Sequence, residues 1–376
     1  MSGRPAGEEQ FMRLALRLAR RGEGFVSPNP MVGAVLVRDG HVVATGYHRA
    51  VGRDHAEVEA LRRVDFHAEG CDLYVNLEPC CHHGRTPPCT DAILRSRVRR
   101  VFVAVRDSNP LVSGRGIETL RSHGIEVHVG LLEREARRLN EAFFHFITTG
   151  TPFVTLKLAA TLDARIAERS GRARWITGEA SRRLVHRIRA RSDAVIVGAG
   201  TALADDPLLW PVSIGARARR PLRVVVDEQA GLAPESQLAR TARESPVLVA
   251  CTEAAPAENR ARLQALGVEV VVLPDEEGLV SLTALLRHLG ARSCENGLVE
   301  GGSRLAAGFL KKRLVQRLLL FYAPMLLADP EAFPLCGDLG LRTLDEAIRT
   351  TVRAVRRIGP DLMVECMLNP DDPPTR

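Results

Sequence analysis

Apolar residues recur at helical spacing near the start of the chain. Between residues 8 and 21 the apolar positions lie three or four residues apart, on two adjoining stripes: Phe11, Met12, Ala15, Leu16, Leu18 and Ala19. This spacing predicts an amphipathic helix, because residues three and four apart share one face of a helix. The segment Ser27-Pro28-Asn29-Pro30 follows, and we expect its prolines to stop the helix.

Strand and helix patterns then alternate up to residue 146. Two valine-rich segments, 31–37 and 41–45, flank Asp39-Gly40, which predicts a β-hairpin with a tight turn. The further expected elements are, in order, a helix over 55–63, a strand over 73–77, a helix from Cys89 or Thr90, a strand over 101–105, a helix after Gly116, a strand over 125–129 and a helix over 133–146. This alternation predicts a layered α/β sandwich.

A cluster of turn-forming residues, Thr148-Thr149-Gly150-Thr151-Pro152, interrupts the pattern and marks the predicted domain boundary. Beyond it the apolar runs resume, with helical stretches between several of them, and we expect strands at 153–158, 193–197, 222–226, 247–250, 268–273, 297–300 and 318–324. The sequence therefore predicts two α/β domains, residues 1–150 and 151–376.

The composition is that of a globular protein with two hydrophobic cores. The chain has 376 residues, of which 45% are hydrophobic and 26% charged. The N-terminus lacks an apolar signal, and no apolar run approaches the roughly 18 residues of a membrane span, so we expect a cytoplasmic protein without a membrane partner. Of the eight cysteines, three lie within residues 80–89, which favours metal or thiol chemistry over disulfides.

The net charge of +7 raises the question of a nucleic-acid partner. The basic residues are spread along the chain, and arginine supplies 49 of the 52. Only 4% of residues are aromatic, which leaves little material for stacking bases. We therefore expect no nucleic-acid partner.

One imidazole and two thiols have the spacing of a catalytic zinc site. His55-Ala56-Glu57 is followed by Pro79-Cys80 and later by Cys89, and zinc deaminases combine H-x-E with a cysteine pair that follows a proline. Three protein ligands leave one position for water, whose pKa zinc lowers to about 7. Glu57 lies two residues from the histidine and is placed to carry protons without binding the metal. We predict a zinc-dependent deaminase of amino groups on nitrogen heterocycles.

Two other interpretations of these residues stay open. A closed structural zinc site would use only neighbouring ligands and leave His55 as a surface residue: Cys80, Cys81, His82, His83 and Cys89. Adjacent cysteines are poorly spaced to point at one ion, however, and this site leaves the H-x-E motif unexplained. The other interpretation is a zinc-stabilised binding module, in which Glu57 would be dispensable.

In the second half, loops that follow predicted strands are the candidate binding segments. Residues 157–166 begin at one strand end, where α/β sheets bind ligands. Gly198-Ala199-Gly200-Thr201 follows another strand, where it forms either a phosphate loop or a simple turn. Glu300-Gly301-Gly302-Ser303 joins a strand to a helix whose free N–H groups suit a pyrophosphate.

Four strings carry a resemblance to a known family, although eight residues separate Cys80 from Cys89 where the generic motif has two. SPNPMVGAVLV (27–37), HAEVEAL (55–61), LEPCCHHGRTPPC (77–89) and DSNPLVSGRG (107–116) closely resemble the bifunctional riboflavin-biosynthesis deaminase/reductases. The resemblance covers nearly the whole chain. It implies a cytidine-deaminase-like three-layer sandwich followed by a dihydrofolate-reductase-like α/β domain, with one zinc ion per chain and NADPH as cofactors.

The resemblance also implies roles for individual residues of the first domain. The metal ligands fall on His55, Cys80 and Cys89, and the catalytic carboxylate falls on Glu57. Six polar loop residues match the family's pyrimidine and phosphate pocket: Asn29, His48, His82, Arg85, Asp107 and Asn109. Without the resemblance, any one of them reads as a solvated loop residue.

For the second domain, the family's cofactor positions fall on Ala159, Trp175, Thr201, Asp205, Gly302, Ser303, Arg304, Leu305, Ala306, Ala307 and Gly308. Its substrate positions fall on Lys157, Arg189, Leu209 and Glu300. Without the resemblance, Trp175 reads as a core aromatic and Arg189 as a solvated helix charge. Three residues depart from the family pattern: Ala173 replaces a serine, Val212 an arginine and Glu228 a smaller residue. A carboxylate near the 2′-phosphate of NADPH would repel it.

The implied activity is a two-step conversion of a small phosphorylated pyrimidine. The first domain would hydrolytically deaminate 2,5-diamino-6-(5-phosphoribosylamino)pyrimidin-4-one, and the second would reduce the ribosyl group to ribityl with NADPH. A competing hypothesis is a nucleic-acid base deaminase, which would need a basic groove and stacking aromatics. The sequence leaves homo-oligomer formation open.

Overall fold

The computed structural model describes residues 6–83, 87–110, 112–173, 175–212 and 220–368. The chain divides into two compact units, Met1–Gly150 and Thr151–Arg376. Each unit has buried apolar clusters of its own, one in the first unit and three in the second. The division follows Gly150, whose positive φ of 70° ends the last helix of the first unit.

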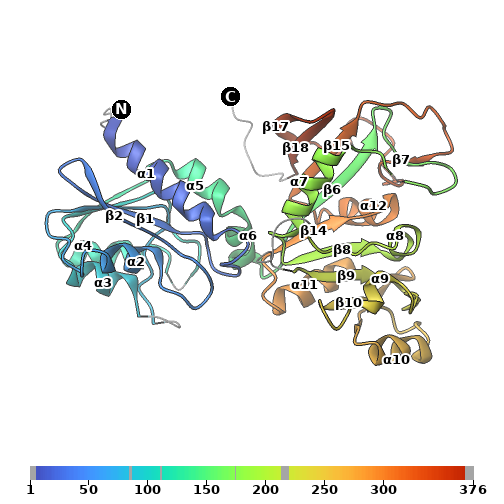
Figure 1. The fold of residues 1–376 in the computed structure, drawn as a ribbon, viewed down its shortest axis with the longest axis horizontal. Helices are drawn as coiled ribbons and strands as arrows, with labels where there is room; N and C mark the ends of the chain where they lie inside the picture. Colours follow the sequence, from blue (N-terminus) through green and yellow to red (C-terminus); the bar gives the residue numbers. More distant parts are fainter. Residues whose placement is uncertain (1–5, 84–86, 111, 174, 213–219, 369–376) are drawn as a thin grey trace. The chain divides into compact units, whose positions relative to one another are not determined.

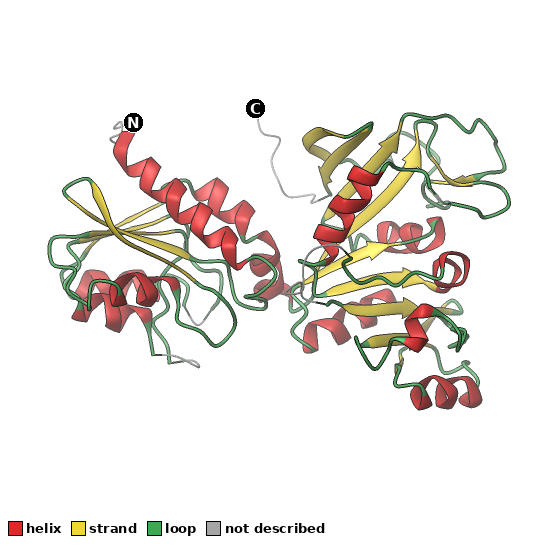
Figure 2. Cartoon of the chain, viewed as in Figure 1, coloured by secondary structure: helices red, strands yellow, loops and turns green. Residues whose placement is uncertain are grey.

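The first unit has three layers. Its central sheet has the order β2-β1-β3-β4-β5 and consists of β1 (Gly33–Arg38), β2 (His41–Tyr47), β3 (Asp72–Val75), β4 (Arg100–Val103) and β5 (Glu126–Val129). One face carries α1 (Ala6–Ala19), continued by a 3-10 turn (Arg20–Gly22), and α5 (Glu133–Leu139). The other face carries α2 (Ala56–Arg62), α3 (Cys89–Arg95) and α4 (Arg115–Ser122), as Figure 1 and Figure 2 show.

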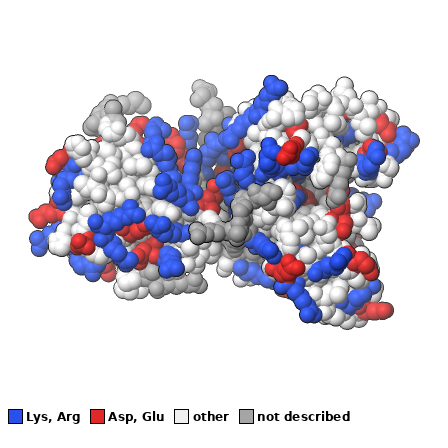
Figure 3. Space-filling view, viewed as in Figure 1, with Lys and Arg blue, Asp and Glu red and all other residues white. Residues whose placement is uncertain are grey.

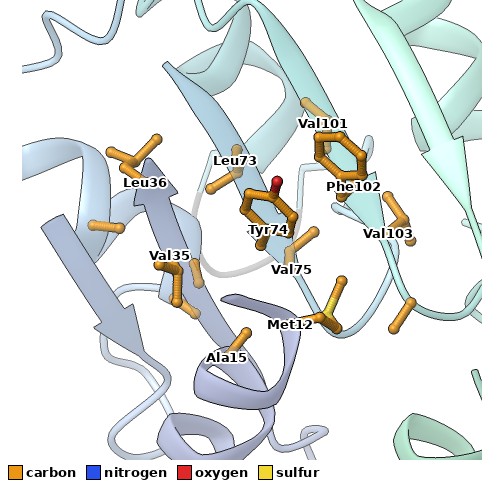
Figure 4. Packing of buried hydrophobic residues seen from close by; sticks show 14 of the residues in the cluster. Met12, Ala15, Val35, Leu36, Leu73, Tyr74, Val75, Val101, Phe102 and Val103 are labelled. Carbon is orange, nitrogen blue, oxygen red and sulfur yellow. The ribbon is translucent and has the colours of Figure 1, made fainter. Parts of the chain in front are cut away.

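The local patterns explain these elements. The apolar stripe of α1 is buried, and Figure 4 shows Met12 and Ala15 packing near Val35 and Tyr74 of the sheet. The hairpin of β1 and β2 turns at Asp39-Gly40, where both residues have positive φ (51° and 74°), as its sequence predicts. The first helix ends at Ala19, before the prolines that we expected to stop it.

The single helix predicted over residues 133–146 is wrong, because the chain forms two helices, α5 and α6 (Glu141–Thr149). Asn140 separates them with a non-helical backbone (φ −108°, ψ 25°). Its buried side chain accepts a hydrogen bond from the Met31 N–H (2.9 Å) and donates one to the Met31 carbonyl (3.0 Å). This distant hydrogen-bond pair fixes the backbone at the break, and the pattern of apolar residues carries no signal of it.

The second unit is built on a nine-stranded sheet with the order β11-β10-β9-β8-β14-β6-β15-β18-β17. Seven strands are parallel: β6 (Phe153–Thr161), β8 (Ala194–Gly198), β9 (Leu222–Val226), β10 (Val247–Cys251), β11 (Glu269–Val272), β14 (Asn296–Glu300) and β15 (Arg317–Ala323). Two short ribbons pair β7 (Arg165–Ala167) with β16 (Phe333–Pro334), and β12 (Asp275–Glu276) with β13 (Leu279–Val280).

Helices cover both faces of this sheet. One buried cluster joins it to α11 (Leu282–Ala291) and α12 (Ser303–Lys311). Two other clusters join it to α7 (Glu179–Arg189), α8 (Ala199–Asp205), α9 (Gln237–Arg240) and α10 (Ala257–Ala265). Because both faces are covered, strands such as β9 and β10 are buried along their whole length, which explains their nearly continuous apolar sequences.

The sheet ends in an antiparallel hairpin that sequence reasoning missed, formed by β17 (Thr351–Ile358) and β18 (Asp361–Met367). The outer strand β17 is largely exposed and carries Arg353, Arg356 and Arg357. Charged residues are typical of an edge strand because they oppose pairing with another chain. They also interrupt the apolar pattern from which the other strands were predicted.

Helix α2 lies directly on β2, and a glycine makes this close packing possible. A Cβ atom added at Gly46 would lie 2.2 Å from the Ala56 carbonyl oxygen and 2.6 Å from the Ala60 nitrogen. Both atoms belong to the backbone of α2, so neither can rotate away. Gly46 therefore sets how closely α2, which follows His55 and carries Glu57, approaches the sheet.

We predict that Gly46→Ala lowers the free energy of unfolding by about 1–3 kcal/mol, because the added methyl group must displace α2. The zinc content of the purified chain should fall as well, since α2 begins next to His55. Denaturant titration and metal analysis measure the two effects. Gly7→Ala is the control, because its Cβ would lie 3.9 Å from Gln10 Nε2, at the end of a flexible side chain. Equal stability of Gly46→Ala and the unaltered chain would contradict the role given to Gly46.

Candidate active sites

Two helix starts and one loop bring the predicted zinc ligands together. His55 is the N-cap residue of α2, and Cys89 is the first residue of α3. Cys80 lies in the loop that follows β3. Both helices pack on the same face of the sheet, so their N-terminal ends can converge beside this loop. The positive end of α3 favours the thiolate form of Cys80, which accepts a hydrogen bond from the Cys89 N–H, whereas the hydrogen bond to Cys80 and burial raise the pKa of the Cys89 thiol.

The ligand atoms have the spacing that zinc needs. His55 Nδ1 lies 3.2 Å from Cys89 Sγ and 3.5 Å from Cys80 Sγ, and all three ligand atoms lie within 4.8 Å of one another. Ligands at ordinary Zn–N and Zn–S distances in a tetrahedron lie roughly 3.5–3.8 Å apart. The donor set of one imidazole and two thiols therefore fits a zinc ion.

Glu57 is buried beside this cluster. Burial raises the pKa of its carboxyl group to about 7, and the group lies within hydrogen-bonding reach of the Cys89 thiol. The Cys80 sulfur accepts hydrogen bonds from the Cys89 thiol, from His55 and from the Cys89 N–H (3.3 Å), and these bonds lower the pKa of Cys80 to about 4. The site thus combines a stabilised thiolate with a carboxyl group that can exchange a proton near neutral pH.

Asn29 and His48 lie next to the zinc ligands. His48 is buried, and burial lowers the pKa of its imidazole. Its Nδ1 lies 3.0 Å from the Asp54 carbonyl oxygen, and its Nε2 lies 3.2 Å from the Asn29 side-chain nitrogen. A neutral ring that donates from Nδ1 and accepts at Nε2 satisfies both contacts. The His48 ring also meets His55 edge-on, with ring centroids 5.3 Å apart.

Asp107, in the loop after β4, and His82, in the same loop as Cys80, lie near the cluster. Burial raises the pKa of Asp107 to about 6, and the charges of Cys80 and His82 act on it as well. Asn109 donates its backbone N–H to the Asp107 carboxylate (2.8 Å). His82 Nδ1 is buried without a hydrogen-bond partner among the described residues. Arg85, which the resemblance also implicates, lies outside the described residues.

Sequence reasoning missed Glu78, which holds the Asp107 segment in place. Its buried carboxylate accepts hydrogen bonds from the N–H groups of Asp107 (3.2 Å), Gly114 (3.0 Å) and Ile117 (3.2 Å). The sequence signal was a carboxylate directly after the predicted strand over 73–77 and two residues before Cys80, where a buried charge needs hydrogen-bond partners.

The geometry does not support the closed structural zinc site. Among the described residues, His55, Cys80 and Cys89 form the group of three or more candidate ligands that can meet at one ion. Neither Cys81 nor His83 belongs to this group, and His83 is exposed. The open three-ligand arrangement is the one that the fold assembles.

In the second unit, buried and half-buried charged side chains meet where β14 ends beside the middle of β6. Lys157 on β6 is the register partner of Glu300 on β14. Arg189, at the end of α7, donates to both Glu300 oxygens from Nε (2.6 Å) and Nη2 (2.9 Å). Burial alone would raise the pKa of Glu300, but the Arg189 guanidinium lowers it, while burial lowers the pKa of Lys157. Arg189 is therefore not the solvated helix charge of the alternative interpretation.

The two glycine-containing segments lie side by side at this sheet edge. Thr201, in the first turn of α8, accepts a hydrogen bond at Oγ1 from the Gly302 N–H (2.9 Å), directly before α12. Residues 303–308 form the first part of α12. The free N–H groups at the start of this nine-residue helix face the same edge and fit the pyrophosphate of a dinucleotide.

The other predicted positions of the second unit lie on several different segments. Ala159 lies on β6 and Asp205 ends α8. Leu209 is buried with a positive φ of 57°. Trp175 is 67% exposed, so it is not a core aromatic, and the Arg182 guanidinium lies 4.5 Å from its ring centroid.

Both units match known families. Residues 6–105 match the family described as cytidine and deoxycytidylate deaminase zinc-binding region. Residues 152–364, more than half of the chain, match the family described as RibD C-terminal domain. The chain belongs to the RibD family. It is a riboflavin-biosynthesis protein with a zinc-binding deaminase domain and a reductase domain of the NADPH-dependent type, as the sequence predicts.

RibD relatives align over nearly their full length. The riboflavin biosynthesis protein RibD of Aquifex aeolicus is 40% identical over 95% of this chain and 97% of its own. That of Escherichia coli is 38% identical over 94% of this chain and 98% of its own. The family relationship therefore extends across both units.

Solved RibD structures confirm the predicted fold. A structure of Acinetobacter baumannii RibD has a TM-score of 0.86 at 34% identity, covering 96% of this chain and 99% of its own. The diaminohydroxyphosphoribosylaminopyrimidine deaminase/5-amino-6-(5-phosphoribosylamino)uracil reductase of Thermotoga maritima has a TM-score of 0.84 at 36% identity, with the same coverage of both chains. These two structures and the two family matches support the deaminase-like and reductase-like architecture.

On the face drawn in Figure 3, basic side chains cover much of the surface of each unit, and smaller groups of acidic side chains lie among them. Within the described ranges, no helix is both long and apolar enough to cross a bilayer.

We predict that Cys80→Ser and Cys89→Ser each release zinc, because a hydroxyl group is a much poorer zinc ligand than a thiolate. Cys81→Ser is the matched control and should retain the metal, since Cys81 is not part of the ligand group. Metal analysis of the three purified variants makes the comparison. Loss of zinc from Cys81→Ser, with folding unchanged by circular dichroism, would instead support the closed structural zinc site.

Proposed function

We propose that the chain is a cytoplasmic, two-step enzyme with one active site in each unit. The first unit hydrolyses the 2-amino group of 2,5-diamino-6-(5-phosphoribosylamino)pyrimidin-4-one and releases ammonia. The second reduces the ribosyl group of the product to ribityl. The convergence of His55, Cys80 and Cys89 beside the buried Glu57 carries the first assignment.

In the deamination step, His55, Cys80 and Cys89 hold the zinc ion. Zinc bound there supplies a water of lowered pKa as the nucleophile. Glu57 takes a proton from the attacking water and delivers it to the departing amine, which its burial and its pKa of about 7 suit. The proton moves between groups without a net change at Glu57, so the residue is ready for the next cycle.

Polar residues around the zinc ligands bind the substrate in this proposal. Asn29 and His48 present one hydrogen-bonded pair beside His55, and Asp107 and Asn109 present another. The buried Nδ1 of His82 has no hydrogen-bond partner among the described residues, and a polar group of the substrate can supply one. We assign these residues, and Arg85 outside the described residues, to the pyrimidine and phosphate pocket.

In the reduction step, NADPH supplies the hydride. We assign binding of the cofactor to Ala159, Trp175, Thr201, Asp205 and residues 302–308. Lys157, Arg189, Leu209 and Glu300 face the substrate. The bidentate Arg189–Glu300 pair and the neighbouring Lys157 keep three charged groups at one strand edge, where they can orient a polar ribosyl phosphate.

A purified sample of the full chain tests both steps directly. Incubated with the diaminopyrimidine substrate and zinc, it should release ammonia, and NADPH should be oxidised only after deamination has occurred. A single-stranded oligonucleotide is the comparison substrate for the competing nucleic-acid deaminase. Ammonia release from the oligonucleotide alone would overturn the proposal.

We predict that Glu57→Gln keeps zinc but loses deamination by about 10²-fold or more, because the amide cannot transfer the proton. Glu59→Gln is the matched control, since Glu59 lies on the same helix and its carboxylate pairs with Arg49 and Arg63. Ammonia release and metal content are measured together. Parallel loss of zinc and activity in Glu57→Gln would mean that Glu57 supports the metal site instead.

We also predict that the two units are separable, because their buried apolar clusters do not share residues. A fragment ending at Thr149 should bind zinc and release ammonia. One beginning at Thr151 should bind the nicotinamide cofactor and oxidise it only with the deaminated product. A folded second fragment that binds neither NADPH nor NADH in titration calorimetry would contradict the reductase assignment.

A further inference from the structure

Two buried asparagine side chains hold the short Met31 segment (residues 31–33), which leads into β1. Asn76 follows β3, and Asn140 separates α5 from α6. Asn140 accepts a hydrogen bond from the Met31 N–H (2.9 Å) and donates one to the Met31 carbonyl (3.0 Å). Asn76 donates to the same carbonyl (3.0 Å) and accepts from the Gly33 N–H (2.7 Å). Both ends of the segment are therefore fixed by side chains that are distant in the sequence.

The Met31 segment in turn holds His48. The His48 N–H donates to the Val32 carbonyl (2.9 Å), in the middle of the segment. The His48 ring is held from the loop directly before the segment, because its Nε2 lies 3.2 Å from the Asn29 side-chain nitrogen. The same ring meets the ring of the zinc ligand His55 edge-on, with centroids 5.3 Å apart. The segment thus connects the two buried asparagines with the polar groups beside the zinc ligands.

An amide is the side chain that this arrangement requires at position 140. One Asn140 side chain must accept from an N–H and donate to a carbonyl of the same residue, and an amide offers both groups side by side. Asn140 is not part of the candidate metal group, and its amide is occupied by the Met31 backbone. Its influence on the site therefore passes through the Met31 segment.

We propose that Asn140 is a positioning residue of the deaminase site. It fixes the Met31 segment and thereby keeps Asn29 and His48 beside the zinc ligands. The inference rests on the proposed function, in which these two residues bind the pyrimidine substrate. Asn140 lies outside residues 6–105, which match the zinc-binding deaminase family, so substrate binding in this chain depends on a residue beyond that match.

The proposal separates substrate binding from zinc chemistry. His55 and Glu57 lie at the start of α2, and Cys89 begins α3, so the position of these groups does not depend on the Asn140 amide. Loss of that amide should loosen Asn29 and His48 and leave the metal and the proton carrier in place. The effect is expected in KM for deamination, because the contacts that weaken are made to the bound substrate.

Steady-state kinetics of Asn140→Ala in the full chain tests this expectation. KM for the diaminopyrimidine should rise about fivefold to tenfold, with kcat within about twofold and the zinc content unchanged. A purely structural loss would instead reduce the number of active molecules, so that apparent kcat falls and KM stays the same. Asn140→Ser, whose hydroxyl group is too short to bridge both Met31 groups, gives the same comparison if the alanine variant does not fold.

Hydrogen–deuterium exchange gives a second readout that needs no reaction. In Asn140→Ala, the peptide that contains residues 31–33 should exchange faster, because the Met31 N–H loses its acceptor. The peptide that contains α3 should exchange at its original rate. Equal acceleration of both peptides would indicate general destabilisation and would overturn the positioning role.

Asp72→Ala is the matched control. Asp72 is also buried, and its carboxylate accepts hydrogen bonds from Arg99 and Arg100 at the start of β3, the end of that strand opposite to Asn76. This variant loses buried hydrogen bonds in the same unit without touching the Met31 segment. Its KM should stay within about twofold of that of the unaltered chain.

A double variant shows whether Asn140 acts through Asn29. If it does, Asn29→Ala combined with Asn140→Ala should raise KM no more than about twofold above the larger single effect. Single effects that multiply in the double variant would overturn the proposal, as would an unchanged KM in folded, zinc-containing Asn140→Ala. Failure of the unaltered chain to release ammonia would overturn the deaminase assignment itself, whereas an unchanged KM leaves that assignment standing.

Discussion

The close packing of α2 on β2 is the contact on which the deaminase site depends. It places the N-terminal end of a helix, with His55 as its cap, beside the loop of Cys80 and the start of α3. The backbones meet at Gly46, where a Cβ would lie 2.2 Å from the Ala56 carbonyl oxygen. Zinc chemistry needs ligand atoms within a few ångström of one another, and such precision comes from rigid helices on a sheet. The same packing buries Glu57, and burial makes its carboxyl group a proton carrier near neutral pH.

In the second unit, the candidate site depends on a parallel sheet, because charged side chains from neighbouring strands meet near the strand ends. Because β14 lies between β8 and β6, Glu300 at the end of β14 is in reach of both Lys157 and Arg189. A buried Glu300 carboxylate without a partner would destabilise the fold. Its two hydrogen bonds from Arg189 offset that cost, and the carboxylate stays charged. Parallel sheets commonly bind ligands at this edge, which also carries the two glycine-containing segments. In both units of this RibD protein, candidate site residues therefore lie at helix starts and strand ends, although the chemistry of the two sites differs.

Local sequence patterns predicted most of the helices and strands. The features that these patterns missed depend on contacts between distant residues. The hairpin at Asp39-Gly40 and the apolar strands of the second sheet needed only turn chemistry and an apolar run. The break at Asn140 depends on hydrogen bonds to Met31, which is 109 residues away in the sequence. Arg223 is another such case, because its fully buried side chain stands within the apolar strand β9 and donates to the carbonyls of Leu208 and Thr241. A pattern that counts apolar positions cannot reveal these partners.

The sequence by itself predicted the three zinc ligands, the carboxylate beside them and a domain boundary near residue 150, and it determined the family. His55 and Glu57 are two residues apart, and Cys80 follows a strand end, so short-range structure already constrains their chemistry. The tertiary structure alone decided which distant groups pair. Glu300 meets Arg189 across 111 residues, Glu78 secures the Asp107 segment, and Asp227 borders a pocket formed by α8 and the segment leading into α9. The reason is physical: spacing along the chain sets local geometry, whereas contacts between distant segments depend on strand register and on which faces pack together.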